Sequence, residues 1–263
     1  MAKKIHYWMG STYMDTGDPL DGSRMIARAV SAWLKEGKMR VLVACEFSGI
    51  VRDAFIRRGH DAMSCDLLPT ELVGPHYQGD VTDILEDGWD LMIAHPPCTY
   101  LASSGLHWNK RVPGREELTH EAMLFVFNLL GEGFISHGIP KIALENPIGC
   151  ISSKYRKPDQ IIQPWQFGHD ASKSTCLWLK GLLPLVPTKI IHPNYGCKCG
   201  HRFEYALGKY GCPNCCGEKG AAKPIWSNQT PSGQNKLGPS DTRALERSRT
   251  YQGIADAMAE QWG

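Results

Sequence analysis

The sequence lacks a long uninterrupted apolar stretch. Its best apolar run, Met123 to Leu130, is broken by Asn128 and falls far short of the roughly 20 residues that a membrane helix needs. The start of the chain carries Lys3 and Lys4 and continues with polar and glycine-containing sequence, so it has no apolar core of a secretory signal. We therefore expect a soluble cytoplasmic protein without membrane contact.

Net charge is also small, because 29 basic and 27 acidic residues leave a formal charge of +2. Nucleic-acid-binding domains usually show a clear basic excess, so any such surface must be a local patch. The ten cysteines do not indicate a disulfide framework, since five of them crowd between residues 197 and 216 and the others are scattered. Their distribution indicates a metal site together with free thiols.

At 263 residues with 42% hydrophobic content, the chain is long enough for one sizeable core and a small appendage. From residue 40 onward, short β-rich apolar runs alternate with amphipathic segments, which is typical of an α/β fold with a parallel sheet covered by helices. The predicted strands are Arg40–Cys45, His60–Cys65, Trp89–Ala94, Lys141–Leu144 and Thr175–Leu179. The predicted helices are Ser23–Glu36, Ile50–Arg58, Glu116–His137 and a closing segment within Asp241–Trp262.

The chain divides into four regions by composition. Residues 1–38 form an N-terminal extension with one helix, and residues 39–189 form the main domain. Residues 190–240 are rich in cysteine, glycine and turn residues and read as an inserted module, after which 241–263 return to the main domain as a closing helix. Within the main domain, residues 99–115 lack a helical or strand period, which predicts a long mobile loop.

Polar residues gather where the predicted strands end. In an open parallel sheet, ligands bind beyond the carboxyl ends of the strands. Gly49 permits close approach of a ligand to the backbone, Asp66 suits hydrogen bonding to ribose hydroxyls, and Asp80 suits an adenine amino group. Each acid taken singly also fits a helix cap or a turn residue. The strand-end candidates are Glu46, Phe47, Ser48, Gly49, Asp66, Asp80, Cys98 and Glu145.

The most informative pair is Pro96-Pro97-Cys98 after one strand and Glu145-Asn146-Pro147 after the next. With this pair the chain resembles the cytosine-5 DNA methyltransferases, and it looks especially like their short phage and prophage members. The resemblance covers about 200 residues and includes Phe47, Gly49, Asp66, Gly79-Asp80 and the closing helix from Arg249 to Trp262. It departs from the family at Val51 and Arg52, which replace later glycines of the cofactor loop, at Pro147, and in lacking a Gln-x-Arg-x-Arg element.

The resemblance implies a Rossmann-like sheet that binds S-adenosylmethionine and methylates carbon 5 of cytosine in duplex DNA, in a bacterial or phage-infected cell. We expect a monomer. Residues 39–189 would then be the catalytic domain. Implied cofactor-binding residues are Glu46, Phe47, Ser48, Gly49, Asp66, Leu67, Asp80, Val81 and Pro96. Lys173 and Thr175 stand in a place comparable to the missing arginine element, so Lys173 is a candidate catalytic cation.

Methylation of carbon 5 of cytosine calls for a thiol and a carboxylate for chemical reasons that do not depend on the resemblance. Carbon 5 of cytosine is a poor nucleophile, so a Cys98 thiolate would add to carbon 6 and push electron density onto it. Glu145 would hold nitrogen 3 and the exocyclic amine of a flipped base, stabilise the developing charge and select cytosine over thymine. The alternative interpretations are a buried structural thiol for Cys98 and a surface ion pair for Glu145.

Two glycine- and proline-containing knuckles hold Cys197, Cys199, Cys212 and Cys215, a pattern close to that of a tetrahedral structural zinc site. Cys216 and His201 are substitute ligands, because the first knuckle is one residue shorter than usual. Four thiolates leave no open position, so the zinc would stabilise a small ribbon without catalysing. The ribbon fits either target recognition, through basic and aromatic residues, or a purely stabilising role; those residues are Lys198, Arg202, Tyr205, Lys209 and Tyr210.

Three further alternatives stay open from the sequence. The same fold and cofactor fit a methyltransferase acting on RNA or on a free cytosine nucleotide, and the altered glycine loop fits a catalytically silent DNA-binding relative. The basic residues Lys110, Arg111 and Arg115 fit either phosphate contacts or a solvated loop.

Overall fold

The computed structural model describes residues 6–9, 12–15, 37–197, 202–203, 222–230, 235–240 and 242–263. The chain splits into two compact units, Met1–Lys38 and Met39–Gly263. In the first unit, β1 (His6–Met9) pairs with β2 (Thr12–Asp15) in an antiparallel hairpin. The helix predicted for Ser23–Glu36 lies outside the described residues.

The second unit is built on a seven-stranded sheet with the order β5-β4-β3-β6-β7-β9-β8. Its strands are β3 (Arg40–Ala44), β4 (Asp61–Asp66), β5 (His76–Gln78), β6 (Leu91–Ala94), β7 (Lys141–Pro147), β8 (Gln160–Ile162) and β9 (Thr175–Lys180). All neighbours pair in parallel except around β9, which runs antiparallel to β7 and to β8. The sheet confirms a mostly parallel α/β architecture and is compatible with a Rossmann-like fold.

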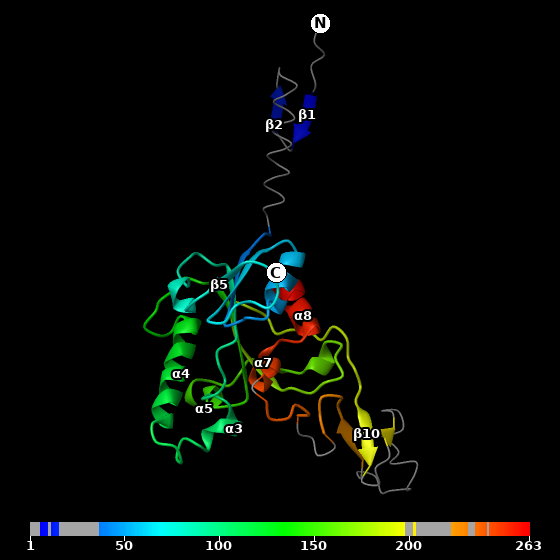
Figure 1. Cartoon of the computed structure of the whole chain (residues 1–263). Helices are drawn as coiled ribbons and strands as arrows, with labels where there is room; N and C mark the ends of the chain where they lie inside the picture. Colours follow the sequence, from blue (N-terminus) through cyan, green and yellow to red (C-terminus); the bar gives the residue numbers. More distant parts are fainter. Residues whose placement is uncertain are drawn as a thin grey trace. The chain divides into compact units, whose positions relative to one another are not determined.

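Successive side chains along a strand point to opposite faces of the sheet, and here both faces are apolar and covered by helices. Val41 and Val43 contribute to one buried cluster, while Leu42 and Ala44 contribute to the other. The first cluster includes side chains of α2 (Ile50–Arg57) and α8 (Gln252–Trp262), and the second includes those of α4 (Arg115–Leu130). Figure 1 shows α4 and α8 on either side of the strands. Strands buried on both faces need apolar residues at every buried position, as β3 has from Val41 to Ala44.

Three predicted elements differ from those observed. The helix predicted for Glu116–His137 ends at Leu130, because Gly131 adopts a φ of 71° and closes the helix. The closing segment is split into α7 (Arg243–Ser248) and α8, with extended backbone at Arg249 and Tyr251 between them. The loop predicted for residues 99–115 contains a short helix, α3 (Ser103–Leu106).

Several short elements were not predicted from the sequence. The edge strand β8 has only three residues, too few to show a period. Likewise short are α5 (Ile151–Lys154) and the 3-10 turns η1 (Val81–Asp83) and η2 (Pro164–Gln166). Short elements of this kind are stabilised by their neighbours in the fold and leave little local signal.

Residues 190–240 contain an antiparallel sheet with the order β11-β10-β12. Its strands are β10 (Asn194–Cys197), β11 (Arg202–Phe203) and β12 (Ala222–Ile225). Cys197 closes β10, whereas Cys199, Cys212, Cys215 and the substitutes His201 and Cys216 lie outside the described residues. Within the described part of the chain, no cluster of three or more His, Cys, Asp or Glu could hold a metal ion. Among those same residues, no helix combines the length and apolarity needed to span a bilayer.

Candidate active site

The candidate site lies where the strand order reverses, between the adjacent strands β3 and β6. Chain connections run outward on either side of this pair, so the carboxyl ends of the two strands border a crevice. The backbone N–H of His95, just past β6, donates to the carbonyl of Ala44, the last residue of β3 (2.9 Å). This bond ties the Glu46–Gly49 loop to the segment that carries Cys98.

The loop after β3 has an unusual backbone. Cys45 has a φ of 59°, the sole positive value at a non-glycine residue in the described part of the chain. Two residues after the buried Phe47, Gly49 adopts a φ of 75° and forms the N-cap of α2. Such strained positions gather at functional sites, and the one at Cys45 could not be predicted from the sequence.

Glu46 is buried and its carboxylate is engaged with the start of α2. It accepts hydrogen bonds from the Ser48 hydroxyl (3.0 Å), the Val51 N–H (2.8 Å) and the Arg52 N–H (3.3 Å). These contacts satisfy backbone donors that the first turn of a helix leaves open. Glu46 and Ser48 therefore shape the predicted cofactor loop through the protein's own hydrogen bonds.

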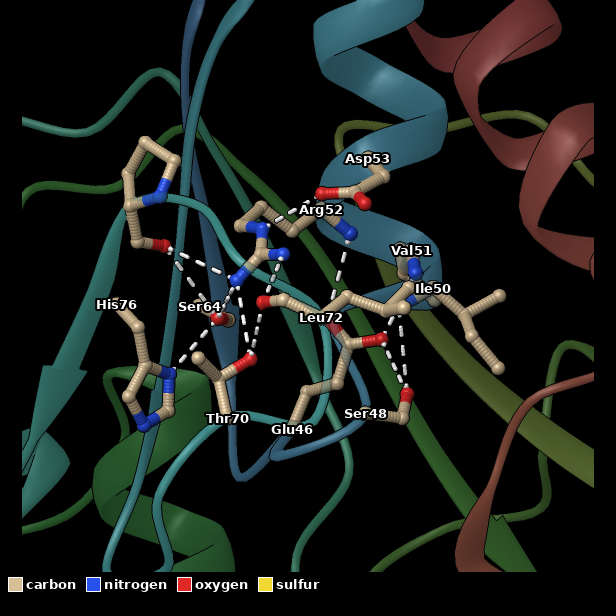
Figure 2. Close-up of polar contacts among 11 residues, drawn as sticks. Glu46, Ser48, Ile50, Val51, Arg52, Asp53, Ser64, Thr70, Leu72 and His76 are labelled. Atoms are coloured by element: carbon tan, nitrogen blue, oxygen red, sulfur yellow. Dashed lines mark hydrogen bonds and ion pairs between the residues drawn. The ribbon is translucent and has the colours of Figure 1, made fainter.

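Arg52, which the sequence analysis noted as a departure from the glycine pattern, is completely buried (Figure 2). Its guanidinium pairs with Asp53 (2.8 Å) and donates to the Leu72 carbonyl (2.8 Å) and the Thr70 hydroxyl (3.1 Å). A side chain on Gly49 or on Gly74 would collide with the guanidinium. Arg52 thus fills the space between α2 and the segment from Thr70 to Pro75 and fixes that segment over the end of β4.

We expect Arg52→Met to lower the free energy of unfolding by about 3 kcal/mol, because the change leaves the buried Ser64 hydroxyl, several partly buried acceptors and Asp53 without their partner. The matched control is Arg57→Met on the same helix, whose pair with Asp256 is exposed. That control should cost about 0–1 kcal/mol. Urea unfolding followed by circular dichroism measures both, and equal effects would contradict a structural role for Arg52.

Two acids converge on this crevice from β4 and from the turn after β5. The charges of Asp66 and Asp80 both help raise the pKa of Cys45, after the larger effect of its burial. Asp66 accepts the Leu68 N–H through Oδ1 (2.9 Å), and Asp80 caps η1 by accepting from the Thr82 N–H (2.9 Å). Leu67 and Val81, the predicted cofactor-binding residues that follow these two acids, differ in exposure. Leu67 is largely exposed and Val81 is buried.

The C-terminal segment reaches the same loop. Arg249 makes an ion pair with Glu71, whose backbone N–H donates to the Phe47 carbonyl (2.8 Å). The guanidinium carbon of Arg249 lies 5.9 Å from the centre of the Phe47 ring. Arg249 therefore fastens the link between α7 and α8 beside the predicted cofactor loop.

The structure brings Cys98, Glu145 and Lys173 into one electrostatic cluster. Burial raises the pKa of the Cys98 thiol, the negative charge of Glu145 raises it further, and Arg247 and Lys173 oppose the shift. The pKa of Glu145 lies below its ordinary value, because the hydrogen bond from His95 and the charge of Lys173 outweigh burial. The residue Cys98 as a whole is nevertheless exposed.

We expect the reaction of Cys98 with iodoacetamide to accelerate about tenfold per pH unit between pH 7 and 9. The raised pKa keeps the thiol protonated at neutral pH, so the thiolate fraction grows as pH rises. Mass spectrometry of the Cys98 peptide measures the rate, with the buried Cys176 in the same digest as an unreactive control. A rate already at its plateau at pH 7 would show a thiol ionised at neutral pH.

His95 and Asn146 hold the two motifs together, and the sequence analysis assigned neither a role. His95 Nδ1 lies 3.1 Å from Glu145 Oε2. The Asn146 side-chain amide donates to the Pro96 carbonyl (2.8 Å), so the strand end that carries Glu145 fixes the turn that carries Cys98. Two side-chain atoms here, His95 Nε2 and Asn146 Oδ1, are buried without a hydrogen-bond partner among the described residues.

The segments that follow the two motifs are also joined. Cys150 N–H donates to the Leu101 carbonyl (2.8 Å), and Ser103 N–H donates to the Ile148 carbonyl (3.0 Å). At Gly149 a side chain would collide with the Leu101 carbonyl, which explains the glycine at this place. Arg115 donates to the Thr99 carbonyl (3.1 Å), so this basic residue has a structural contact next to Cys98.

A small pocket borders this cluster. It is lined by residues from the ends of β6 and β7, from the segment that leads into β9, from the link between α7 and α8, and from α8, which are His95, Glu145, Lys173, Thr175, Thr250, Tyr251, Ile254 and Met258. Lys173 is anchored at its ammonium group, which donates to the Arg247 carbonyl (2.9 Å). The preceding Ser172 exchanges two hydrogen bonds with Asn228, which lies just past β12 (3.0 and 2.9 Å). The inserted segment therefore helps to position the loop that carries Lys173.

The described cluster thus contains a thiol, a carboxylate and a lysine at neighbouring strand ends, beside a glycine loop and two further acids. No family model matches the chain, and the search of curated proteins finds no significant match.

Proposed function

We propose that the protein is an S-adenosylmethionine-dependent methyltransferase that modifies carbon 5 of cytosine in DNA. The observation that carries the proposal is the placement of Cys98 and Glu145 at the ends of the adjacent parallel strands β6 and β7, where the Asn146 amide donates to the Pro96 carbonyl (2.8 Å) and joins the two motifs. The charge of Glu145 also helps to raise the pKa of the Cys98 thiol, after the larger effect of burial. A lone cysteine or a lone acid would have ordinary structural explanations. Their convergence at the carboxyl ends of strands, with Lys173 beside both, is the arrangement that covalent catalysis on a pyrimidine requires.

The reaction follows from the chemistry of these groups. The Cys98 sulfur adds to carbon 6 of the base, and the proton of its thiol passes through Glu145 to nitrogen 3, where the negative charge of the ring would otherwise gather. Glu145 also accepts a hydrogen bond from the amino group, and Lys173 adds positive charge to the same region. Once carbon 5 has gained its methyl group, it loses its proton and the thiolate leaves, which restores the aromatic ring and the free enzyme.

The residues around β3 and β4 suit a nucleoside cofactor. Gly49 adopts the positive φ that turns the loop into α2, and Asp66 and Asp80 place two acids at neighbouring strand ends. S-Adenosylmethionine supplies an electrophilic methyl group when bound. Asp66 would hold its ribose and Asp80 its adenine amino group, with Phe47, Leu67, Val81 and Pro96 beside them, while Glu46, Ser48 and Arg52 shape the loop.

The DNA partner is proposed from basic residues in the segment that follows Cys98. Lys110 and Arg111 are exposed, and the Arg111 guanidinium lies 5.6 Å from the centre of the Trp108 ring. A basic and aromatic surface of this kind can contact phosphates and unstacked bases. Arg115 is less available, because it packs against Tyr100 and donates to Thr99.

We also propose a structural zinc ion on Cys197, Cys199, Cys212 and Cys215. The support is the spacing of the cysteines, together with the place of Cys197 at the end of β10, shortly before β11 begins at Arg202. We expect about one zinc ion per chain by elemental analysis, and a Cys212→Ser, Cys215→Ser double variant should lose it. Full zinc occupancy in that double variant would contradict the assignment.

The function is tested with S-adenosylmethionine labelled in its methyl group. Duplex DNA of mixed sequence, RNA of the same sequence and cytidine nucleotides serve as parallel substrates, and the products are separated as nucleosides by mass spectrometry. We expect 5-methylcytosine in DNA. Label in RNA or nucleotide would reassign the substrate. Binding of the cofactor and of DNA without any transfer would identify a silent DNA-binding relative.

A further inference from the structure

The base of the inserted segment is fixed to the main domain beside the segment that leads into β9. The Trp226 ring, just past β12, is buried and stacks on the Trp165 ring, with 5.9 Å between the ring centres and 13° between the planes. Asp170 accepts the Ser227 N–H through Oδ1 (3.3 Å). These contacts hold the next residue, Asn228, against the chain that approaches the active site.

Asn228 makes two hydrogen bonds with the backbone of the residue before Lys173. The Ser172 N–H donates to Asn228 Oδ1 (3.0 Å), and the Asn228 amide donates to the Ser172 carbonyl (2.9 Å). A backbone N–H only donates and a backbone carbonyl only accepts, so these partners fix which way the amide faces. Two bonds from one planar amide restrict both the position and the orientation of the backbone from which Lys173 continues.

The same side chain reaches the segment that anchors the charged end of Lys173. Burial raises the pKa of Tyr251, and a hydrogen bond with the Asn228 side chain opposes the increase. Tyr251 lies between α7 and α8, and the Lys173 ammonium group donates to the carbonyl of Arg247 in α7 (2.9 Å). From the main domain, Gln163 Oε1 accepts the Lys173 N–H (2.9 Å). Asn228 is the residue of the inserted segment that joins both ends of this arrangement.

We propose that Asn228 is a positioning residue that keeps the Lys173 ammonium group beside the thiol and the carboxylate of the active site. The inserted segment is then part of that site, although it supplies no reacting group. This inference rests on the proposed function, because it concerns the cation of the same site. Lys173 and Tyr251 both line the pocket beside Glu145, so a shift of either segment changes where positive charge lies.

A displaced Lys173 can be detected without methyl transfer. Burial and the charge of Glu145 raise the pKa of the Cys98 thiol, whereas the charge of Lys173 lowers it. Moving that positive charge away therefore raises the pKa further and reduces the thiolate fraction at neutral pH. The rate at which iodoacetamide alkylates Cys98 thus reports where the Lys173 ammonium group lies.

The test is a double-mutant cycle in the full-length protein, with Asn228→Ala, Lys173→Met and their combination. We expect Asn228→Ala to slow the alkylation of Cys98 about two- to fivefold at pH 7, because the ammonium group moves away. In the Lys173→Met background the same replacement should leave the rate unchanged, since no charge remains to be displaced. A change that only loosened the fold or altered access to the thiol would act in both backgrounds.

Gln229→Ala, at a half-buried neighbour in the same segment, is the matched control and should alkylate as the wild type does. Circular dichroism establishes that each variant is folded. Should Asn228→Ala not fold, Asn228→Gln takes its place in the cycle with the same expectation, because its amide sits on a longer side chain and is displaced from Ser172.

An unchanged rate in the Asn228 variant, an equal slowing in the Lys173→Met background, or an equal slowing by Gln229→Ala would overturn the inference. Failure of the proposed function is separate, because the cycle is measured without cofactor or DNA. A protein that shows the expected cycle but transfers no methyl group would keep the positioning role of Asn228 and lose the proposed reaction.

Discussion

Replacing Cys98 by serine should abolish methyl transfer, with a loss of at least about 10³-fold in kcat, while leaving the fold intact. A hydroxyl is far less ionised than a thiol at neutral pH, so it cannot add to carbon 6 at a useful rate. The change is nearly isosteric at an exposed position, so the free energy of unfolding should change little. Transfer of labelled methyl groups to duplex DNA measures the loss.

The matched control for this substitution is Cys150→Ala. Cys150 is buried near Met123, away from the charges around Glu145, and its thiol has no place in the proposed chemistry. We expect this variant to be somewhat less stable but active. Transfer by Cys98→Ser at a rate near that of the wild type would remove the thiol from the mechanism.

Replacing Glu145 by glutamine should lower kcat by about 10²–10³-fold, which is typical for removal of one preorganised group that stabilises charge in the transition state. The same substitution should have an opposite effect on Cys98. The negative charge of Glu145 helps to raise the pKa of that thiol, so its removal lowers the pKa and speeds the reaction with iodoacetamide at pH 7. A thiol that becomes more reactive in an enzyme that becomes slower would separate the two roles of Glu145.

The control for Glu145→Gln is Glu117→Gln on the exposed surface of α4, which should change neither rate. Parallel losses in thiol reactivity and in methyl transfer would contradict the proposed electrostatic coupling. Such losses would instead indicate that Glu145→Gln disturbs the turn held by Asn146 and Pro96.

The sequence was sufficient for the strands that form the centre of the sheet. Runs such as Val41–Ala44 and Leu91–Ala94 are apolar at every position because both faces are covered, and few other structures need that pattern. The antiparallel direction of β9 could not be predicted, since direction depends on the path of the preceding chain. The end of α4 was predictable in principle, because Gly131 is a common helix terminator, but the apolar residues Phe134 and Ile135 extended the apparent period.

The site was predictable where chemistry follows a motif and not where it depends on packing. Cys98 and Glu145 stand in recognisable motifs. Lys173 was predicted as a candidate catalytic cation from its position just before a predicted strand. Arg52 was noted as a departure from the glycine pattern, but its burial and its contacts with the segment from Thr70 to Pro75 involve residues far along the chain. His95 gave no signal of its own, because one histidine before two prolines is compatible with many structures.

The most direct test of covalent catalysis by Cys98 is to trap its adduct with DNA. Duplex DNA that contains 5-fluorocytosine is incubated with the protein and S-adenosylmethionine, and the products are resolved under denaturing conditions and digested for mass spectrometry. Fluorine at carbon 5 cannot leave as a proton would, so the thiolate cannot be released after methyl transfer. We predict a stable protein–DNA complex linked through Cys98, which Cys98→Ser does not form. Methylation of ordinary duplex DNA at carbon 5 without any such adduct would contradict the mechanism.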